Sequence, residues 1–169
     1  MLFRSRSRDG NGGSRDLASL VVAIDHKFRP DPGVENWSDL QLEAAIMPVK
    51  WLRFEAFSKL DIEHPELNEL NTGISVIDGR YWSAGISTHF LRQDIEEYDL
   101  RVMRRINEEF SAGARFRYDA RTDSLYEQTY SLRQTIRNLW AIDYEISFQE
   151  RLRREGSVHF RIAIDLLDF

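Results

Sequence analysis

Apolar side chains occupy every second position along most of this chain, and no other feature restricts the fold as strongly. In a β-strand, successive side chains point to opposite faces of the sheet, so a period of two predicts strands that are apolar on one face only. A helix would scatter the same positions around its axis. The alternation predicts an all-β, antiparallel up-and-down meander of about ten long strands, at residues 17–28, 40–46, 52–62, 70–76, 82–90, 98–106, 110–118, 126–136, 140–148 and 158–168.

One stretch, IEEYDLRVMRRINEE at residues 95–109, is rich in helix-forming residues. Its apolar residues Tyr98, Leu100 and Val102 still alternate, so we predict a strand here too.

The connections between the predicted strands alternate between longer and shorter ones. The shorter ones fall near residue 48, at Asp78-Gly79, at 107–109 and at 137–138, and Asp78-Gly79 predicts a two-residue hairpin turn. Transmembrane barrels show the same asymmetry, with short periplasmic turns and longer outer loops. This scheme places residue 17 and the end of the chain on one side, the periplasmic one.

Composition excludes several classes of protein. Hydrophobic residues make up 42% of the 169 residues and charged residues 30%, and no apolar run approaches the roughly eighteen residues of a spanning helix. The net charge is −5 with both signs interspersed, so we expect no nucleic-acid partner. Without cysteine, the chain has no disulfide and no thiolate metal site. Residues 1–16, rich in Arg, Gly and Ser, are expected to be a flexible lead-in to a segment at 17–169, and the chain is expected to be the C-terminal part of a longer protein.

The odd-numbered face is too charged to pack into a core, so we expect it to line water. The lumen-facing candidates are Arg53, Glu55, Arg101, Arg105, Glu127, Arg133, Asp143, Glu145 and Arg161. The even-numbered face would then meet lipid, with Ile142, Tyr144, Ile146 and Phe148 opposite in direction to Asp143, Glu145 and Ser147. In a soluble barrel the apolar face would point inward and the charged face outward, so the alternation alone does not distinguish the two. Two features favour the membrane: the long strands, and aromatic residues near the predicted strand ends, namely Trp37, Trp51, Trp82, Tyr126, Tyr130 and Trp140.

The run RYDARTDSLYEQTYSLRQTIRNLWAIDYEISFQERLRREGSVHFRIAIDLLDF, and more loosely VVAIDHKFRPDPGVENWSDLQLEA, resembles the C-terminal barrel of the lipopolysaccharide-assembly outer-membrane protein family (LptD, or organic-solvent-tolerance, family). The resemblance implies a barrel in the cell outer membrane that works with a plug lipoprotein. Such a barrel receives lipopolysaccharide from a periplasmic bridge and inserts the lipopolysaccharide into the outer leaflet. It also implies a terminal strand read by the barrel-insertion machinery, here Phe160, Ile162, Ile164, Leu166 and Phe169.

The chain departs from the family in three ways. The apolar set of the last strand is out of phase with Phe169, which predicts a bulge at Leu166-Leu167. The family's barrel has far more than ten strands, and its periplasmic domain has no counterpart in this sequence, which a fragment would explain.

No pattern indicates catalysis, a cofactor or a metal. The histidines His26, His64, His89 and His159 lack ligand spacing, and the carboxylate pairs Asp61/Glu63 and Glu96/Glu97 are typical of solvated surface. We therefore expect no enzyme activity.

Two alternatives remain open. The chain could be a complete ten-stranded outer-membrane channel, adhesin or surface hydrolase, or a soluble ligand-binding β-barrel. A complete barrel would pair residues 17–28 with 158–168, whereas a fragment would leave both edges open.

Overall fold

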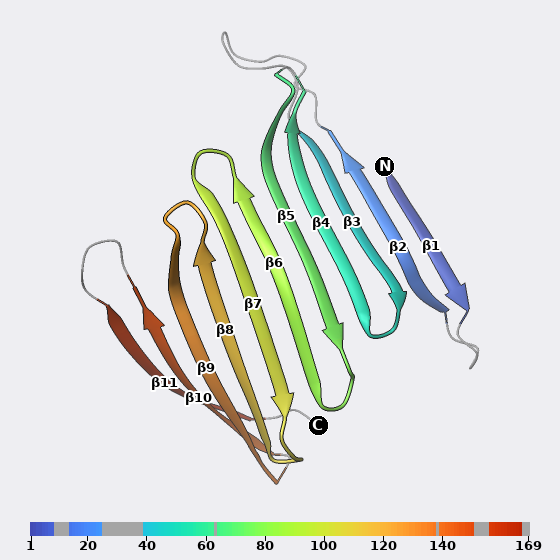
Figure 1. Cartoon of the computed structure of the whole chain (residues 1–169). Coiled ribbons are helices and arrows are strands. Elements are labelled where there is room, and N and C mark those ends of the chain that lie inside the picture. Colours follow the sequence, from blue (N-terminus) through green and yellow to red (C-terminus); the bar gives the residue numbers. More distant parts are fainter. Residues whose placement is uncertain (9–13, 25–38, 63, 138, 151–155, 167–169) are drawn as a thin grey trace. The chain divides into compact units, whose positions relative to one another are not determined.

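The fold is an all-β antiparallel meander, as predicted (Figure 1). The computed structural model describes residues 1–8, 14–24, 39–62, 64–137, 139–150 and 156–166. Eleven strands follow one another in a single up-and-down sheet that does not close into a barrel, so that β1 and β11 are its edges. The strands are β1 (Leu2–Arg8), β2 (Ser14–Ala23), β3 (Leu40–Val49), β4 (Leu52–Asp61), β5 (Glu66–Ile77), β6 (Trp82–Leu91), β7 (Ile95–Arg105), β8 (Phe110–Asp119), β9 (Ser124–Ile136), β10 (Trp140–Gln149) and β11 (Ser157–Leu166).

The N-terminal strand corrects the expected flexible lead-in. Residues 2–8 form β1, which pairs with β2 and brings the total in the described chain to eleven rather than ten. Arg6 Nε donates to Asp16 Oδ1 at 2.7 Å, and Arg4 Nε lies 3.8 Å from the other carboxylate oxygen. This strand alternates arginine with serine rather than apolar with polar residues, so a search for apolar periodicity misses it. The helix-rich stretch, by contrast, forms β7 as predicted.

The strands divide into two compact units. Unit 1 comprises Met1–Ser75 with Ser87–Glu96, and unit 2 comprises Val76–Ile86 with the described part of Glu97–Phe169. In unit 1, Leu20 pairs with Ala44, and Ala44 in turn with Ala56. Near the end of β3, Ile46 pairs with Phe54.

The register in unit 2 separates two faces. On the apolar face, Tyr144 lies between Leu132 and Ile162. In the β7–β8, β9–β10 and β10–β11 ladders, every even-numbered residue pairs with an even-numbered residue. On the charged face, Asp143 lies between Arg133 and Ala163. The predicted separation of Ile142, Tyr144, Ile146 and Phe148 from Asp143, Glu145 and Ser147 is confirmed.

A bulge in β9 corrects the expected position of Tyr126. Arg117 pairs with Glu127 but Tyr118 pairs with Leu125, which leaves Tyr126 as the extra residue. Its hydroxyl group interacts with the Glu97 carboxylate and the Arg117 guanidinium, both on the charged face, instead of joining the apolar face. Register shifts also occur in the β1–β2 and β3–β4 ladders. The bulge predicted at Leu166-Leu167 extends outside the described residues.

The connections do not alternate in length as predicted. The connection 92–94, expected to be long, is shorter than 78–81, and 120–123 is no longer than 106–109. The hairpin predicted at Asp78-Gly79 is present, but its loop is 78–81, closed by the Asp78 N–H donating to the Trp82 carbonyl at 3.0 Å. The turn lies where the sequence predicts it, but its loop has four residues instead of two.

Very little of the described chain is buried. Ala141, at 0% exposure, and Ser147, at 7%, are the buried residues, and large apolar side chains on the even-numbered face are broadly exposed. Within the described ranges, no helix has the length and apolarity needed to cross a membrane.

Gly79 gives a test of the β5–β6 turn. Its φ is +75°, and a Cβ added there would meet nothing within 4 Å. We expect Gly79→Ala to lower the free energy of unfolding by about 1–2 kcal/mol through backbone strain alone, and Gly79→Asn to lower it less. Gly73→Ala, whose Cβ would make an ordinary 3.8 Å contact, is the control and should be neutral or stabilising. Urea unfolding followed by tryptophan fluorescence measures all three, and equal effects at both glycines would contradict the turn geometry.

Candidate functional site

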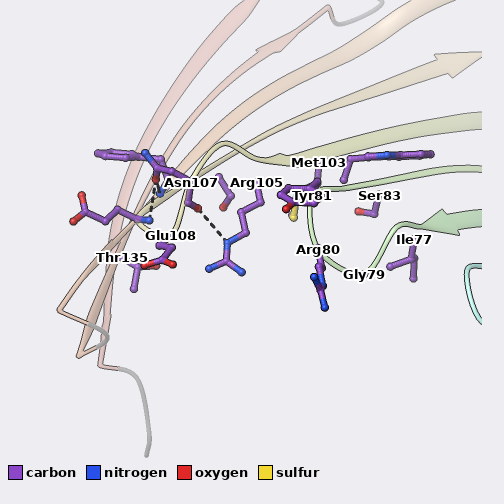
Figure 2. Close-up of a pocket in the computed structure, with 14 residues that line it drawn as sticks. Ile77, Gly79, Arg80, Tyr81, Ser83, Met103, Arg105, Asn107, Glu108 and Thr135 are labelled. Carbon is purple, nitrogen blue, oxygen red and sulfur yellow. Dashed lines mark hydrogen bonds between the residues drawn. The ribbon is translucent and has the colours of Figure 1, made fainter.

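The charged face of unit 2 holds an open pocket of about 340 Å³ (Figure 2). The turns 78–81 and 106–109 and the adjoining ends of β6, β7 and β8 form most of its lining. Arg105 Nε donates to the Asn107 carbonyl at 3.1 Å, and Asn107 Oδ1 accepts from the backbone N–H groups of Glu109 at 2.9 Å and Phe110 at 2.7 Å. These bonds fix the second turn. Two arginines and two glutamates line the pocket, so it has no net charge with which to select an ion.

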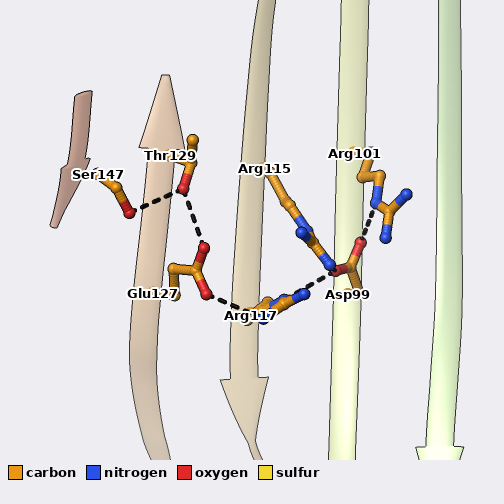
Figure 3. Close-up of polar contacts among 7 residues, drawn as sticks. All are labelled: Asp99, Arg101, Arg115, Arg117, Glu127, Thr129 and Ser147. Atoms are coloured by element: carbon orange, nitrogen blue, oxygen red, sulfur yellow. Dashed lines mark hydrogen bonds and ion pairs between the residues drawn. The ribbon is translucent and has the colours of Figure 1, made fainter. Parts of the chain in front are cut away.

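The main cluster of charge lies further along the same face. We call it the Asp99 network: Asp99, Arg101, Arg115, Arg117 and Glu127, drawn in Figure 3. Asp99 accepts from Arg101 Nε at 2.7 Å, from Arg115 Nε at 2.6 Å and from Arg117 Nε at 3.3 Å. Arg117 Nη1 also donates to Glu127 Oε2 at 3.0 Å. Three guanidinium groups therefore share two carboxylates across β7, β8 and β9.

Hydroxyl groups extend the network to β10. The Thr129 hydroxyl donates to Glu127 Oε1 at 3.1 Å and lies 3.0 Å from the Ser147 hydroxyl (Figure 3). Ser147 is one of the two buried residues of the described chain. A continuous line of polar contacts therefore crosses four neighbouring strands at one level of the sheet.

Six other predicted lumen residues form three separate pairs, whereas Arg105 lines the pocket described above. Arg133 Nη1 lies 3.3 Å from Asp143 Oδ2, and Arg161 Nη2 lies 3.3 Å from Glu145 Oε2. In unit 1, Arg53 pairs with Glu55 on the same strand. Because these side chains are between about 28% and 65% exposed, each pair contributes little to stability.

The structure thus joins two of the predicted residues, Arg101 and Glu127, in one network. The three residues that complete it, Asp99, Arg115 and Arg117, were not among the predicted ones. Each has the same odd-numbered parity, which was a usable signal, but their convergence depends on the register between strands.

The apolar face carries a row of aromatic contacts. Tyr130 packs edge-on against Phe116, with ring centroids 5.9 Å apart, and against Phe148 at 6.3 Å. The expectation that Tyr130 lies near a strand end was wrong, because it is central in β9 and neighbouring strands supply its partners. Trp82 and Trp140 begin their strands as expected, and Trp51 lies in a turn.

The terminal-strand residues share this apolar face. Phe160, Ile162, Ile164 and Leu166 are 53–66% exposed. The remaining predicted positions, Phe169 and Trp37, lie outside the described residues.

The described histidines form no cluster. His89 Nδ1 hydrogen-bonds with Asn71, His159 Nε2 lies 3.1 Å from the Ser157 hydroxyl, and His64 lies 3.5 Å from Asp61. His26 lies outside the described residues. Among those that are described, no three His, Asp or Glu side chains come together in a way that could hold a metal ion.

An open antiparallel meander with one charged and one apolar face is therefore the class of structure to which this chain belongs. No protein-family model matches the sequence, and no curated protein matches it.

The Asp99 network predicts that Asp99 contributes more to the stability of the fold than Glu55 does. The Asp99 side chain is 14% exposed and faces three arginines, whereas that of Glu55 is 54% exposed and faces one. We expect Asp99→Asn to lower the free energy of unfolding by about 1–3 kcal/mol, because it leaves three guanidinium groups with one carboxylate. Glu55→Gln should change it by less than about 0.5 kcal/mol. Urea titrations measure both free energies of unfolding, and in 0.5 M salt the loss caused by Asp99→Asn should be smaller because salt screens the charges. Equal losses in the two variants would contradict the network.

Proposed function

We propose that this sheet is part of the wall of a β-barrel in the cell outer membrane, and that the barrel takes part in moving lipopolysaccharide to the outer leaflet. The observation that carries the proposal is the separation of the sheet into an apolar face and a charged face. The chain would then act as a transport and assembly protein rather than as an enzyme.

The apolar face supports a lipid environment. Its side chains remain exposed in strand after strand, for example Leu100 at 41% and Tyr130 at 40%. Monomeric proteins in water rarely expose contiguous apolar patches beyond a few hundred Å². Strands β2 to β11 have 10 to 13 residues, which suits a tilted crossing of the hydrocarbon core, for which about ten residues are needed.

The charged face supports a water-filled interior. Its ions are paired across strands, as Arg133 is with Asp143, and such pairing suits a polar lumen wall. The Asp99 network carries one more arginine than carboxylates, which favours a cargo with phosphate groups. Membrane lipids, a plug lipoprotein and the barrel-insertion machinery are partners implied by the family resemblance alone.

The alternatives are less well supported. In a closed ten-stranded barrel β2 would pair with β11, but β2 already pairs with β1 on one side and β3 on the other. A soluble ligand-binding barrel would need its apolar face covered, and the described residues leave that face exposed.

Two adjacent positions in β9 test the membrane assignment. Leu132 lies on the apolar face and Ser131, opposite Gly113, on the charged face. Leu132→Arg should reduce insertion of the full chain into phospholipid vesicles by at least tenfold, because a cation on the lipid face costs about 2–4 kcal/mol near the midplane. Ser131→Arg is the control and should insert like the unmodified chain, as measured by protease protection. Equal insertion of both variants, or an unmodified chain that stays monomeric without lipid or detergent, would favour the soluble alternative.

Two arginines in β7 test the cargo. Arg101 lies on the charged face within the Asp99 network, and Arg104, opposite Ala112, lies on the apolar face. We expect Arg101→Gln to weaken binding of lipopolysaccharide by the micelle-embedded chain several-fold, and Arg104→Gln to leave it unchanged. Microscale thermophoresis with intact and dephosphorylated lipopolysaccharide measures this difference. Equal affinity for both forms would refute the cargo while leaving the membrane assignment intact.

A further inference from the structure

The pocket on the charged face of unit 2 exposes large apolar side chains. The odd-numbered residues of β7 within this unit are charged except Met103, which is 54% exposed. Tyr81, at 62% exposure, and Ile77, at 49%, line the same pocket. A polar wall that faced only water would gain nothing from gathering these side chains at one place, and grouped apolar exposure is typical of a binding site.

Short side chains beside long ones make this surface concave. The Arg105 N–H donates to the Tyr81 carbonyl at 2.6 Å, and Arg105 pairs with Ser111, so these three residues form one row across the sheet. Met103, two residues before Arg105 on the same face, pairs with Gly113. Serine and glycine do not fill the space beside Arg105 and Met103. The register of β7 and β8 therefore builds the hollow.

Polar groups of both kinds surround the apolar part of the pocket. Arg80 and Arg105 supply hydrogen-bond donors, and Glu108 and Glu109 supply acceptors. Among the described residues none of these four side chains has an ion-pair partner, and the one side-chain hydrogen bond is that of Arg105 Nε to the Asn107 carbonyl. Figure 2 shows the Arg80 and Arg105 side chains extending in the same direction. Donors and acceptors are therefore both available to a ligand.

The place of the pocket in the sheet restricts what can bind there. Strands β6, β7 and β8 lie in the interior of the sheet, between neighbours on both sides, so the pocket offers no free edge to another strand. Its charges balance, which disfavours a phosphate group or another simple ion. The ligand that fits is uncharged, is held by side chains, and combines a flat apolar surface with many donors and acceptors.

A sugar ring has these properties, and we propose that the pocket binds a neutral saccharide. The C–H face of the ring lies against the Tyr81 ring beside Met103. Its hydroxyl groups, each both donor and acceptor, accept from Arg80 and Arg105 and donate to Glu108. The pocket volume of about 340 Å³ is within the range of about 300–1,000 Å³ that is usual for small-molecule sites. The inference goes beyond the proposed function, because it requires neither a membrane nor a phosphate group.

Methionine methyl NMR measures binding at this pocket directly. The chain contains Met1, Met47 and Met103, and of these Met103 lines the pocket. The probes are a panel of neutral di- to tetrasaccharides, added to the full chain in polyoxyethylene-ether micelles because detergents with sugar headgroups would compete. We expect at least one saccharide to shift the Met103 methyl resonance saturably and to leave that of Met47 unchanged.

Substitution of Tyr81 separates stacking from adventitious contact. Tyr81→Ala should weaken binding about tenfold because the surface for the sugar ring is lost, whereas Tyr81→Phe should retain it. The matched control is Trp51→Ala, which removes an aromatic side chain of 52% exposure from a turn in unit 1 and should leave the affinity unchanged. Because the ligand is uncharged, the affinity should be the same in about 0.5 M salt.

Three results would overturn the proposal: no saccharide shifts the Met103 resonance, the shift persists at equal affinity in Tyr81→Ala, or the affinity falls steeply with salt, as expected for an ion. The panel includes the phosphate-free oligosaccharide released from lipopolysaccharide. A preference for it identifies the saccharide as part of the cargo, and a preference for another member identifies a separate glycan. Vesicle insertion and phosphate-dependent binding are measured separately, so a failure here leaves the proposed function standing.

Discussion

A single antiparallel sheet cannot bury its own apolar face, and this constraint governs the rest of the structure. In the described residues only Ala141 and Ser147 are buried, so no hydrophobic core comparable to that of a two-layer domain exists. Backbone ladders and side-chain pairs between neighbouring strands connect the strands, and such pairs are individually weak. The apolar face requires a cover that the described chain does not supply, and any account of function has to name that cover.

Much of the fold could be predicted from the sequence because alternation is a local property. The pattern Ile142, Tyr144, Ile146, Phe148 identifies both a strand and its two faces without knowledge of its neighbours. The same method overlooked β1, in which residues 4–8 alternate arginine with serine and Arg6 pairs with Asp16 of β2. It also misjudged the connections, because strand ends depend on which residues the neighbouring strand can pair.

The candidate site was less predictable for the same reason. Parity placed Arg101 and Glu127 on one face, but the convergence of Arg115 and Arg117 on Asp99 requires the β7–β8 register, in which Asp99 lies opposite Arg117. Tyr126 shows how far a single irregularity propagates. Because β9 has one extra residue, the Tyr126 side chain lies on the charged face, and strict alternation against β8 begins only at Glu127.

The positions of the bulges explain how the two faces stay separate. A slip of one residue in mid-strand would exchange the faces of everything beyond it and would place charged side chains among the apolar ones. In β9 the shift occurs beside Leu125, close to the start of the strand, and in β3 it follows Ile46, close to the end. Each leaves a long uninterrupted stretch, such as Glu127–Gln134 against β8, in which alternation is strict. The shift in the β1–β2 ladder is different, because it lies between Ser5 and Arg6 in the middle of β1, so the two halves of this edge strand lie in different phases against β2.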